Sequence, residues 1–104
     1  MKLQLQEIIN NNDLISKAWN GFWKNFDSYI SEEKPPELKS RDSIIPYLSS
    51  YAYKYWPDDE DDDGGVEYIV IRIEFCDLND KDIGYYDACF EMDGSWRDDF
   101  CIIY

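Results

Sequence analysis

The spacing of apolar residues changes once along this chain of 104 residues, and the change limits the fold to one class. Ile15, Trp19, Phe22, Phe26 and Ile30 recur at steps of three and four residues, which is the period of an amphipathic helix. From residue 66 onward, apolar residues recur at every second position, which is the period of a β-strand. The sequence therefore predicts an α+β fold in which N-terminal helices pack on a C-terminal sheet.

Polar residues and prolines mark the expected ends of the helical segment. Asn12 or Asp13 is placed to cap a helix that spans about residues 13–30, and Pro35 and Pro36 close it. Residues 1–10 stay open between a short helix and a strand, because their apolar positions fit either period.

A second helix is expected to begin at Asp42 or Ser43 and to end before Pro57. Pro46 would lie in its first turn, where the missing N–H of a proline is tolerated. The apolar side of this helix would consist of Ile44, Leu48, Tyr51 and Tyr55.

The last third of the chain predicts a three-stranded antiparallel β-meander, with the helices packed on one of its faces. Asp93 and Gly94 form a hairpin signal between the second and third strands. A three-residue loop at positions 93–95 is preferred to a two-residue turn, because it keeps Trp96, Phe100 and Ile102 on the helix-covered face. A slip of one residue would reverse that assignment for the whole third strand.

This register also predicts which side chains lie on the open face of the sheet, away from the helices. Asp98 would lie on the packed face. The open face would collect Arg72, Glu74, Asp87, Glu91, Arg97 and Asp99, with Cys76, Cys89 and Cys101 on the same side.

Negative charge is confined to the second half of the chain. Residues 1–56 hold seven Lys or Arg and seven Asp or Glu, whereas residues 57–104 hold three and sixteen, so the second half carries the whole formal net charge of −13. Hydrophobic residues make up 44% of the chain and aromatic residues 17%, which indicates a folded protein rather than an acidic disordered tail. We expect one domain, 1–104, made of a helical neutral half (1–56), an acidic loop (57–65) and an acidic sheet (66–104).

The cellular location is predicted from three features of the sequence. The first residues lack the apolar core of a signal peptide, and no apolar stretch approaches the roughly 20 residues that span a bilayer. The three cysteines are odd in number and widely spaced, which favours reduced thiols over a disulfide framework. We therefore expect a cytoplasmic protein.

The sequence offers little chemistry for catalysis or for a cofactor. It contains no His, so no imidazole can activate a cysteine or complete a triad or a zinc cluster. Asp59, Asp61 and Asp63 match the first ligand positions of a calcium loop, but the twelfth position is Val70 instead of Glu. We expect neither an enzyme nor a bound metal or cofactor.

An acidic chain disfavours direct contact with nucleic-acid phosphates and anionic lipids, and its natural complement is a cationic protein. Tight binding would also need aromatic anchors beside the carboxylates. The residues predicted to bind the partner are therefore Asp58, Asp59, Glu60, Asp61, Asp62, Asp63, Tyr85, Asp87, Glu91, Trp96, Asp98 and Asp99.

In its overall profile, a small acidic α+β domain with aromatic residues beside residues 58–63, 91, 98 and 99, the chain resembles immunity proteins of bacterial toxin systems, including those of contact-dependent growth inhibition. The resemblance implies a stoichiometric inhibitor of a nuclease toxin whose RNA- or DNA-binding cleft is basic. Two other functions stay open: a nucleic-acid mimic that inhibits DNA- or RNA-binding proteins, and a calcium-binding acidic module.

Overall fold

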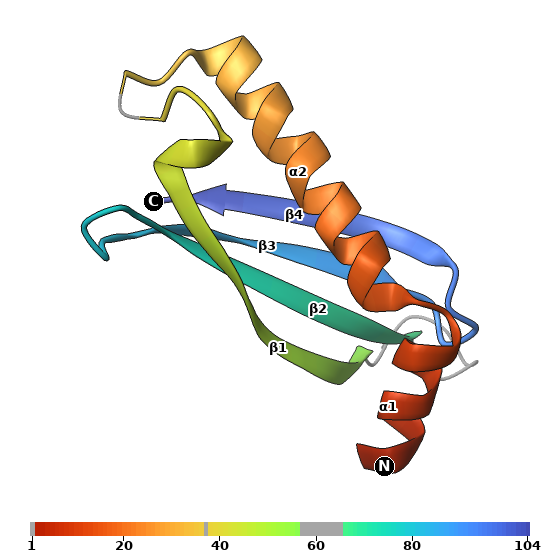
Figure 1. Cartoon of the computed structure of the whole chain (residues 1–104). Helices are drawn as coiled ribbons and strands as arrows, with labels where there is room; N and C mark the ends of the chain where they lie inside the picture. Colours follow the sequence, from red (N-terminus) through yellow and green to blue (C-terminus); the bar gives the residue numbers. More distant parts are fainter. Residues whose placement is uncertain (1, 37, 57–65) are drawn as a thin grey trace.

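Two helices and a four-stranded antiparallel sheet form the described part of the molecule (Figure 1). The structure is a computed structural model that describes residues 2–36, 38–56 and 66–104. The predicted α+β class is confirmed, but the sheet has four strands in the order β1-β2-β3-β4 instead of three. The elements are α1 (Lys2–Asn11), α2 (Leu14–Glu33), the short 3-10 helix η1 (Arg41–Ser43), β1 (Ile44–Trp56), β2 (Val66–Asp77), β3 (Asp82–Phe90) and β4 (Trp96–Ile103).

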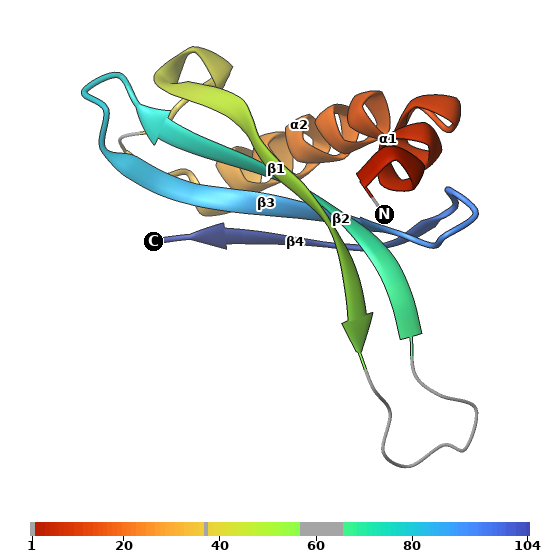
Figure 2. The same ribbon diagram turned by 90° about the horizontal axis from the view of Figure 1, so that it is seen from below.

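The core lies between α2 and one face of the sheet. Figure 2 shows α2 running along that side of the strands. The Phe22 ring lies 5.4 Å from the Phe75 ring of β2 and 5.9 Å from the Tyr86 ring of β3. The helical period in the sequence thus identified the core-facing side of α2. Its fully buried residues are Leu14, Ala18, Phe22 and Phe26, and those of the sheet are Ile69, Ile71, Ile73, Phe75, Tyr86, Ala88 and Phe90.

Residues 2–11 form the helix α1, and Asp13, one of the two residues predicted to cap the longer helix, lies at its N-cap position but does not cap it with its side chain. Asp13 has a left-handed backbone with φ 54° and its side chain makes no capping hydrogen bond. Asn12 instead closes α1, because its side-chain amide donates to the carbonyl of Ile8 at 2.9 Å. At the other end, the N–H of Lys34 donates to the carbonyl of Ile30, and α2 ends before the two prolines, as expected.

Residues 44–56 form the edge strand β1, so the predicted second helix is wrong. This segment is rich in Ile and Tyr, which fit a pleated surface, and it pairs with the whole of β2 from Ile44↔Asp77 to Trp56↔Val66. Pro46 is compatible with the strand because one side of an edge strand needs no ladder hydrogen bonds. A register shift between Leu48 and Ser50 moves the inward-facing positions by one.

The register predicted for the last strand is also wrong. Phe90 pairs with Trp96, and after an irregularity that leaves Arg97 of β4 without a paired residue the next pairs include Ala88↔Asp99 and Asp87↔Phe100. The connection is a five-residue loop, 91–95, in which Gly94 has a positive φ of 89° and donates its N–H to the Glu91 carbonyl.

The corrected register exchanges two sets of side chains between the faces of the sheet. Asp99 and Cys101 lie on the helix-covered face, whereas Asp98, Phe100 and Ile102 lie on the open face. The physical reason is that Asp99 finds hydrogen-bond donors inward, from Tyr86 and Asn25. Trp96 is on the helix-covered side, as predicted.

Candidate protein-binding surface

The open face of the sheet, which faces away from α2, exposes large apolar side chains. Phe100 exposes 51% of its surface and Tyr104 exposes 73%. The outer face of a one-sided antiparallel sheet is normally polar, and contiguous exposed apolar surface often marks an interaction site. The exposed large hydrophobic side chains on this side are Ile45, Tyr47, Phe100, Ile102 and Tyr104.

An arginine at the centre of the open face is already neutralised within the protein. The Nε and Nη2 atoms of Arg72 donate to the two carboxylate oxygens of Asp87 at 2.8 and 2.9 Å. The guanidinium carbon also lies 4.0 Å from the centroid of the Tyr85 ring. The hydrogen bonds to Asp87 raise the pKa of Arg72 above its ordinary value. This cation is therefore fixed in place and does not offset the other carboxylates of the face.

Several carboxylates around this face have no cationic partner among the described residues. The ion pairs among the described residues are Arg41–Asp27, Arg72–Asp87 and Arg97–Glu91. Glu74 accepts a hydrogen bond from Ser49 but takes part in none of these pairs, and neither does Asp82 or Asp98. Desolvation, and then the charges of Glu74 and Asp82, raise the pKa of Tyr47. The exposed apolar side chains of the open face thus lie in a negative field.

A hollow of about 290 Å³ lies at the end of the open face where β2 begins. Arg97 is one of its lining residues. The guanidinium carbon of Arg97 lies 5.5 Å from the centroid of the Tyr68 ring, and its Nη1 atom lies 3.0 Å from a carboxylate oxygen of Glu91. The hollow is lined by Val66, Tyr68, Cys89, Arg97, Asp98 and Phe100.

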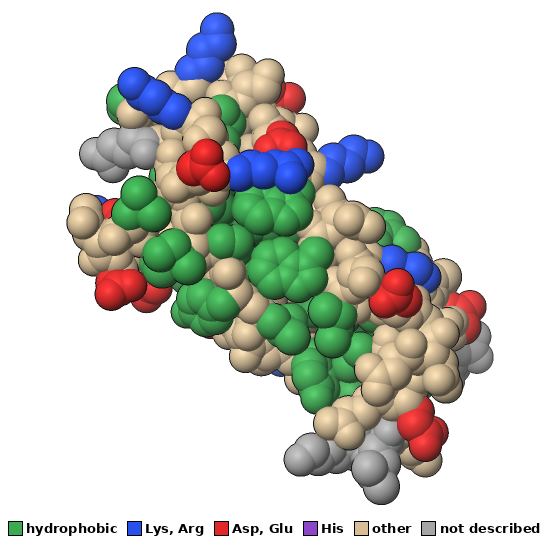
Figure 3. Space-filling model, in the orientation of Figure 1, with side chains coloured by type: hydrophobic (Ala, Val, Ile, Leu, Met, Phe, Trp, Pro, Cys, Tyr) green, Lys and Arg blue, Asp and Glu red, His purple; other side chains and the backbone are tan. Residues whose placement is uncertain are grey.

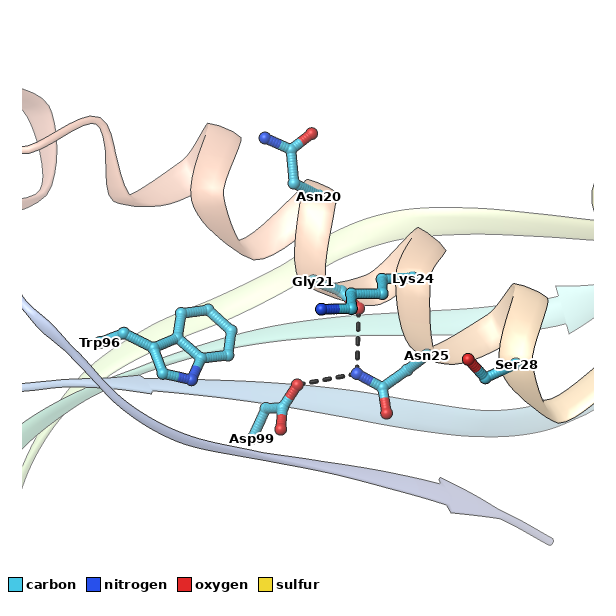
Figure 4. Close-up of a pocket in the computed structure, with 7 residues that line it drawn as sticks. All are labelled: Asn20, Gly21, Lys24, Asn25, Ser28, Trp96 and Asp99. Carbon is cyan, nitrogen blue, oxygen red and sulfur yellow. Dashed lines mark hydrogen bonds between the residues drawn. The ribbon is translucent and has the colours of Figure 1, made fainter.

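A second pocket, of about 440 Å³, lies on the other side of β4, between that strand and α2 (Figure 4). The Oδ2 atom of Asp99 accepts hydrogen bonds from the Tyr86 hydroxyl and the Asn25 side-chain amide, both at 2.8 Å. The Trp96 ring packs edge-on against Phe90, with 5.4 Å between centroids. Burial and the Asp99 hydrogen bond raise the pKa of Tyr86, so its hydroxyl stays a donor.

The predicted partner-binding residues divide between the two faces of the sheet. Tyr85, Asp87 and Asp98 lie on the open face, Trp96 and Asp99 lie on the helix-covered side, and Glu91 lies in the β3–β4 loop. All of them belong to β3, β4 and the loop between these strands, and β4 is an edge strand. The members that belong to β4, Trp96 and Asp99 on one side and Asp98 on the other, therefore lie along the edge of the sheet. The other predicted residues, Asp58, Asp59, Glu60, Asp61, Asp62 and Asp63, lie outside the described residues, and so does the calcium-loop pattern.

Sequence reasoning missed Tyr47, Phe100, Ile102 and Tyr104 as candidate binding residues. Tyr47 was assigned to a helix that is in fact β1, and the reversed register of β4 placed Phe100 and Ile102 in the core. The sequence did contain one signal, since Phe100, Ile102 and Tyr104 occupy every second position at the end of the sequence and would share one face of a strand.

The cysteines are all free thiols. Burial raises the pKa of Cys89 to about 11, and it also raises the pKa values of Cys76 and Cys101. The thiols are therefore protonated and weakly nucleophilic at neutral pH. The described residues contain no group of three or more His, Cys, Asp or Glu arranged to hold a metal ion. No helix among them is long and apolar enough to cross a membrane.

The helix-covered side has an apolar surface of its own. Figure 3 shows apolar side chains gathered between α2 and β1, with acidic and basic side chains mixed around them. Trp19 and Trp23 of α2 and Tyr51 of β1 are partly buried against the core, and Arg41 lies 4.7 Å over the Trp23 ring while it pairs with Asp27. This band belongs to the neutral half of the chain, so it lacks the negative field that surrounds β4.

No protein-family model, curated protein or solved structure matches this chain. What the protein binds is therefore inferred from the chemistry of its own surfaces.

Proposed function

We propose that this protein binds and neutralises a cationic protein, as an immunity protein does with a nuclease toxin. The docking surface, here named the β4 surface, consists of Tyr85, Asp87, Trp96, Asp98, Asp99, Phe100 and Ile102. The observation that supports it most strongly is the combination of exposed apolar side chains with carboxylates that have no cationic partner among the described residues, on an edge strand.

The apolar members of this surface provide the affinity in the proposed complex. A few desolvated side chains dominate most interfaces, and each contributes about 2 kcal/mol or more. Phe100 and Ile102 expose 51% and 43% of their surface, so a partner can bury both without unfolding any part of the domain. Trp96, on the other side of the strand, exposes 47%.

The carboxylates of the β4 surface provide fast association with a cationic partner and selectivity for it. A nuclease cleft is cationic because it holds phosphates. The positive potential of the cleft also attracts an acidic inhibitor, and this attraction accelerates association. Once bound in the cleft, the inhibitor excludes the nucleic-acid substrate. The free edge of β4 also offers backbone N–H and C=O groups to an extended segment of a partner. The other edge strand, β1, is less suited to this pairing because Pro46 has no N–H to donate to an added strand.

A nucleic-acid mimic would need rows of carboxylates at the spacing of phosphates. On the described open face, Tyr85, Phe100 and Ile102 separate the carboxylates, and Asp87 is bound to Arg72. This arrangement favours one specific protein partner over many partners that share a nucleic-acid groove. The proposed inhibitor acts in the cytoplasm, where its thiols stay reduced.

The test uses surface plasmon resonance to measure binding of the chain to each basic protein that the genes next to its own encode. Phe100→Ser should raise Kd at least tenfold. The matched control is Leu78→Ser, because Leu78 exposes 66% of its surface in the β2–β3 turn and is not part of the β4 surface, and this variant should bind like the parent. Equal effects of the two substitutions, or no binding to any neighbouring gene product, would contradict the proposal.

A further inference from the structure

The pocket between α2 and β4 contains the carboxylate of Asp99, which is held by hydrogen bonds to only one of its two oxygens. Both hydrogen bonds to Asp99, from Tyr86 and Asn25, use the Oδ2 atom. The Oδ1 atom takes no part in these bonds. Every buried side-chain nitrogen or oxygen of the described residues has a hydrogen-bond partner, so an oxygen without one, such as Oδ1, must be accessible to solvent. Asp99 also forms no ion pair within the described part of the chain. A ligand with N–H donors and a positive charge fits this oxygen.

Trp96 supplies an aromatic surface in the same pocket (Figure 4). One end of its indole reaches Gly21 on α2, since its Cη2 atom lies 2.9 Å from the place that a Cβ would take on that glycine. Phe90 supports the ring from the sheet. The indole is thus held in place by helix and sheet while 47% of its surface remains exposed. A fixed ring costs less entropy on binding than a mobile one.

A carboxylate and an indole in one pocket are complementary to arginine. The guanidinium group is planar, donates to a carboxylate and stacks on aromatic rings, whereas the lysine ammonium is a compact charge without a flat face. Three further lining residues, Asn20, Asn25 and Ser28 of α2, are polar and uncharged, so their side-chain oxygens can accept other N–H groups of the guanidinium. We infer that this pocket binds one arginine side chain of the cationic partner. The inference rests on the proposed function and adds a defined contact to it.

Lys24 is the one cation that lines this pocket. Its side chain is exposed and no ion pair joins it to Asp99. An ammonium group at the rim repels an incoming guanidinium group, so Lys24 weakens the site. Removal of that charge should therefore tighten arginine binding.

The experiment titrates the chain with N-acetyl-arginine methylamide and follows the indole N–H signals by NMR at about 0.15 M salt, where long-range attraction is screened. The Trp96 signal is assigned with the Trp96→Phe variant. It should shift saturably with a Kd in the millimolar range. N-acetyl-citrulline methylamide, which has the same shape and no charge, should leave the signal in place.

Three variants make the result specific. Asp99→Asn keeps an oxygen for Tyr86 and Asn25, so the fold is retained, and it should weaken arginine binding at least tenfold. Asp98→Asn removes the same charge one residue away on the opposite face, and it should bind the probe like the parent. Lys24→Gln should bind it several-fold more tightly.

A Trp96 signal that does not respond in a folded protein would overturn the inference. So would equal responses to the arginine and citrulline probes, or equal losses in the Asp98 and Asp99 variants. If the arginine probe fails but the basic partner still binds in a way that depends on Phe100, only the pocket is wrong. If the probe binds and no basic partner does, the proposed function is wrong and the pocket stands.

Discussion

Gly21 marks the closest approach of α2 to the sheet, and its replacement by alanine gives the sharpest test of the packing that positions Trp96 and Asp99. A Cβ at this position would overlap the Tyr86 hydroxyl and would lie 2.9 Å from Trp96 Cη2. Alanine favours a helix over glycine by about 1 kcal/mol. Against this gain, an overpacked contact costs about 1–3 kcal/mol, and loss of the hydrogen bond to the Asp99 carboxylate costs about 1.5–3 kcal/mol.

The balance predicts that Gly21→Ala destabilises the protein by about 3 kcal/mol, which corresponds to a fall in Tm of roughly 15 °C for a domain of this size. Urea denaturation and thermal melting measure both values. Ser16→Ala, at an exposed position of the same helix, is the control and should raise stability slightly. In a Tyr86→Phe background the clash with the hydroxyl disappears, so Gly21→Ala should cost much less. A Gly21→Ala protein as stable as the parent would refute the reasoning.

Two further predictions concern the ion pair on the open face and alkaline stability. Arg72→Met leaves the half-buried Asp87 carboxylate without its cationic partner and should lower the free energy of unfolding by about 2 kcal/mol. The double variant Arg72→Met/Asp87→Asn removes the unpaired charge as well and should recover most of that loss. Equal urea midpoints for the single and the double variant would contradict the stabilising role of the Arg72–Asp87 ion pair. The folded-state pKa of Tyr86 is raised above its ordinary value of 10.0, so the stability it contributes is present below pH 10 and falls as the pH rises further, by up to about 1.4 kcal/mol per pH unit. Urea denaturation at about pH 8 and about pH 11 should therefore show a shallower loss in Tyr86→Phe than in the parent, and parallel losses would contradict the prediction.

The sequence predicted the longer helix and the three C-terminal strands because their apolar residues repeat with undisturbed periods. Residues 44–56 misled the prediction for a physical reason. The register shift between Leu48 and Ser50 places Leu48 and Tyr51 on the same face of β1, and a spacing of three residues is also a helical step. A strand that contains such an irregularity imitates a helix in any count of apolar positions.

The face assignment of β4 failed because it depends on contacts distant in the sequence. Hydrophobicity alone turns Phe100 inward, but the structure turns Asp99 inward, where Asn25 and Tyr86 donate to it from 74 and 13 residues away. No local pattern contains that information. The prediction that the binding residues belong to the acidic strands remains a hypothesis, and the corrected register adds Phe100 and Ile102 to them.

The most direct measurement is a crystal structure of the chain in complex with the cationic protein that it binds. The account predicts that β4 lies in the interface, with Phe100 buried, Asp98 facing cationic side chains and an arginine between Trp96 and Asp99. A partner bound to the apolar band between α2 and β1, with the carboxylates of β4 left in solvent, would contradict it.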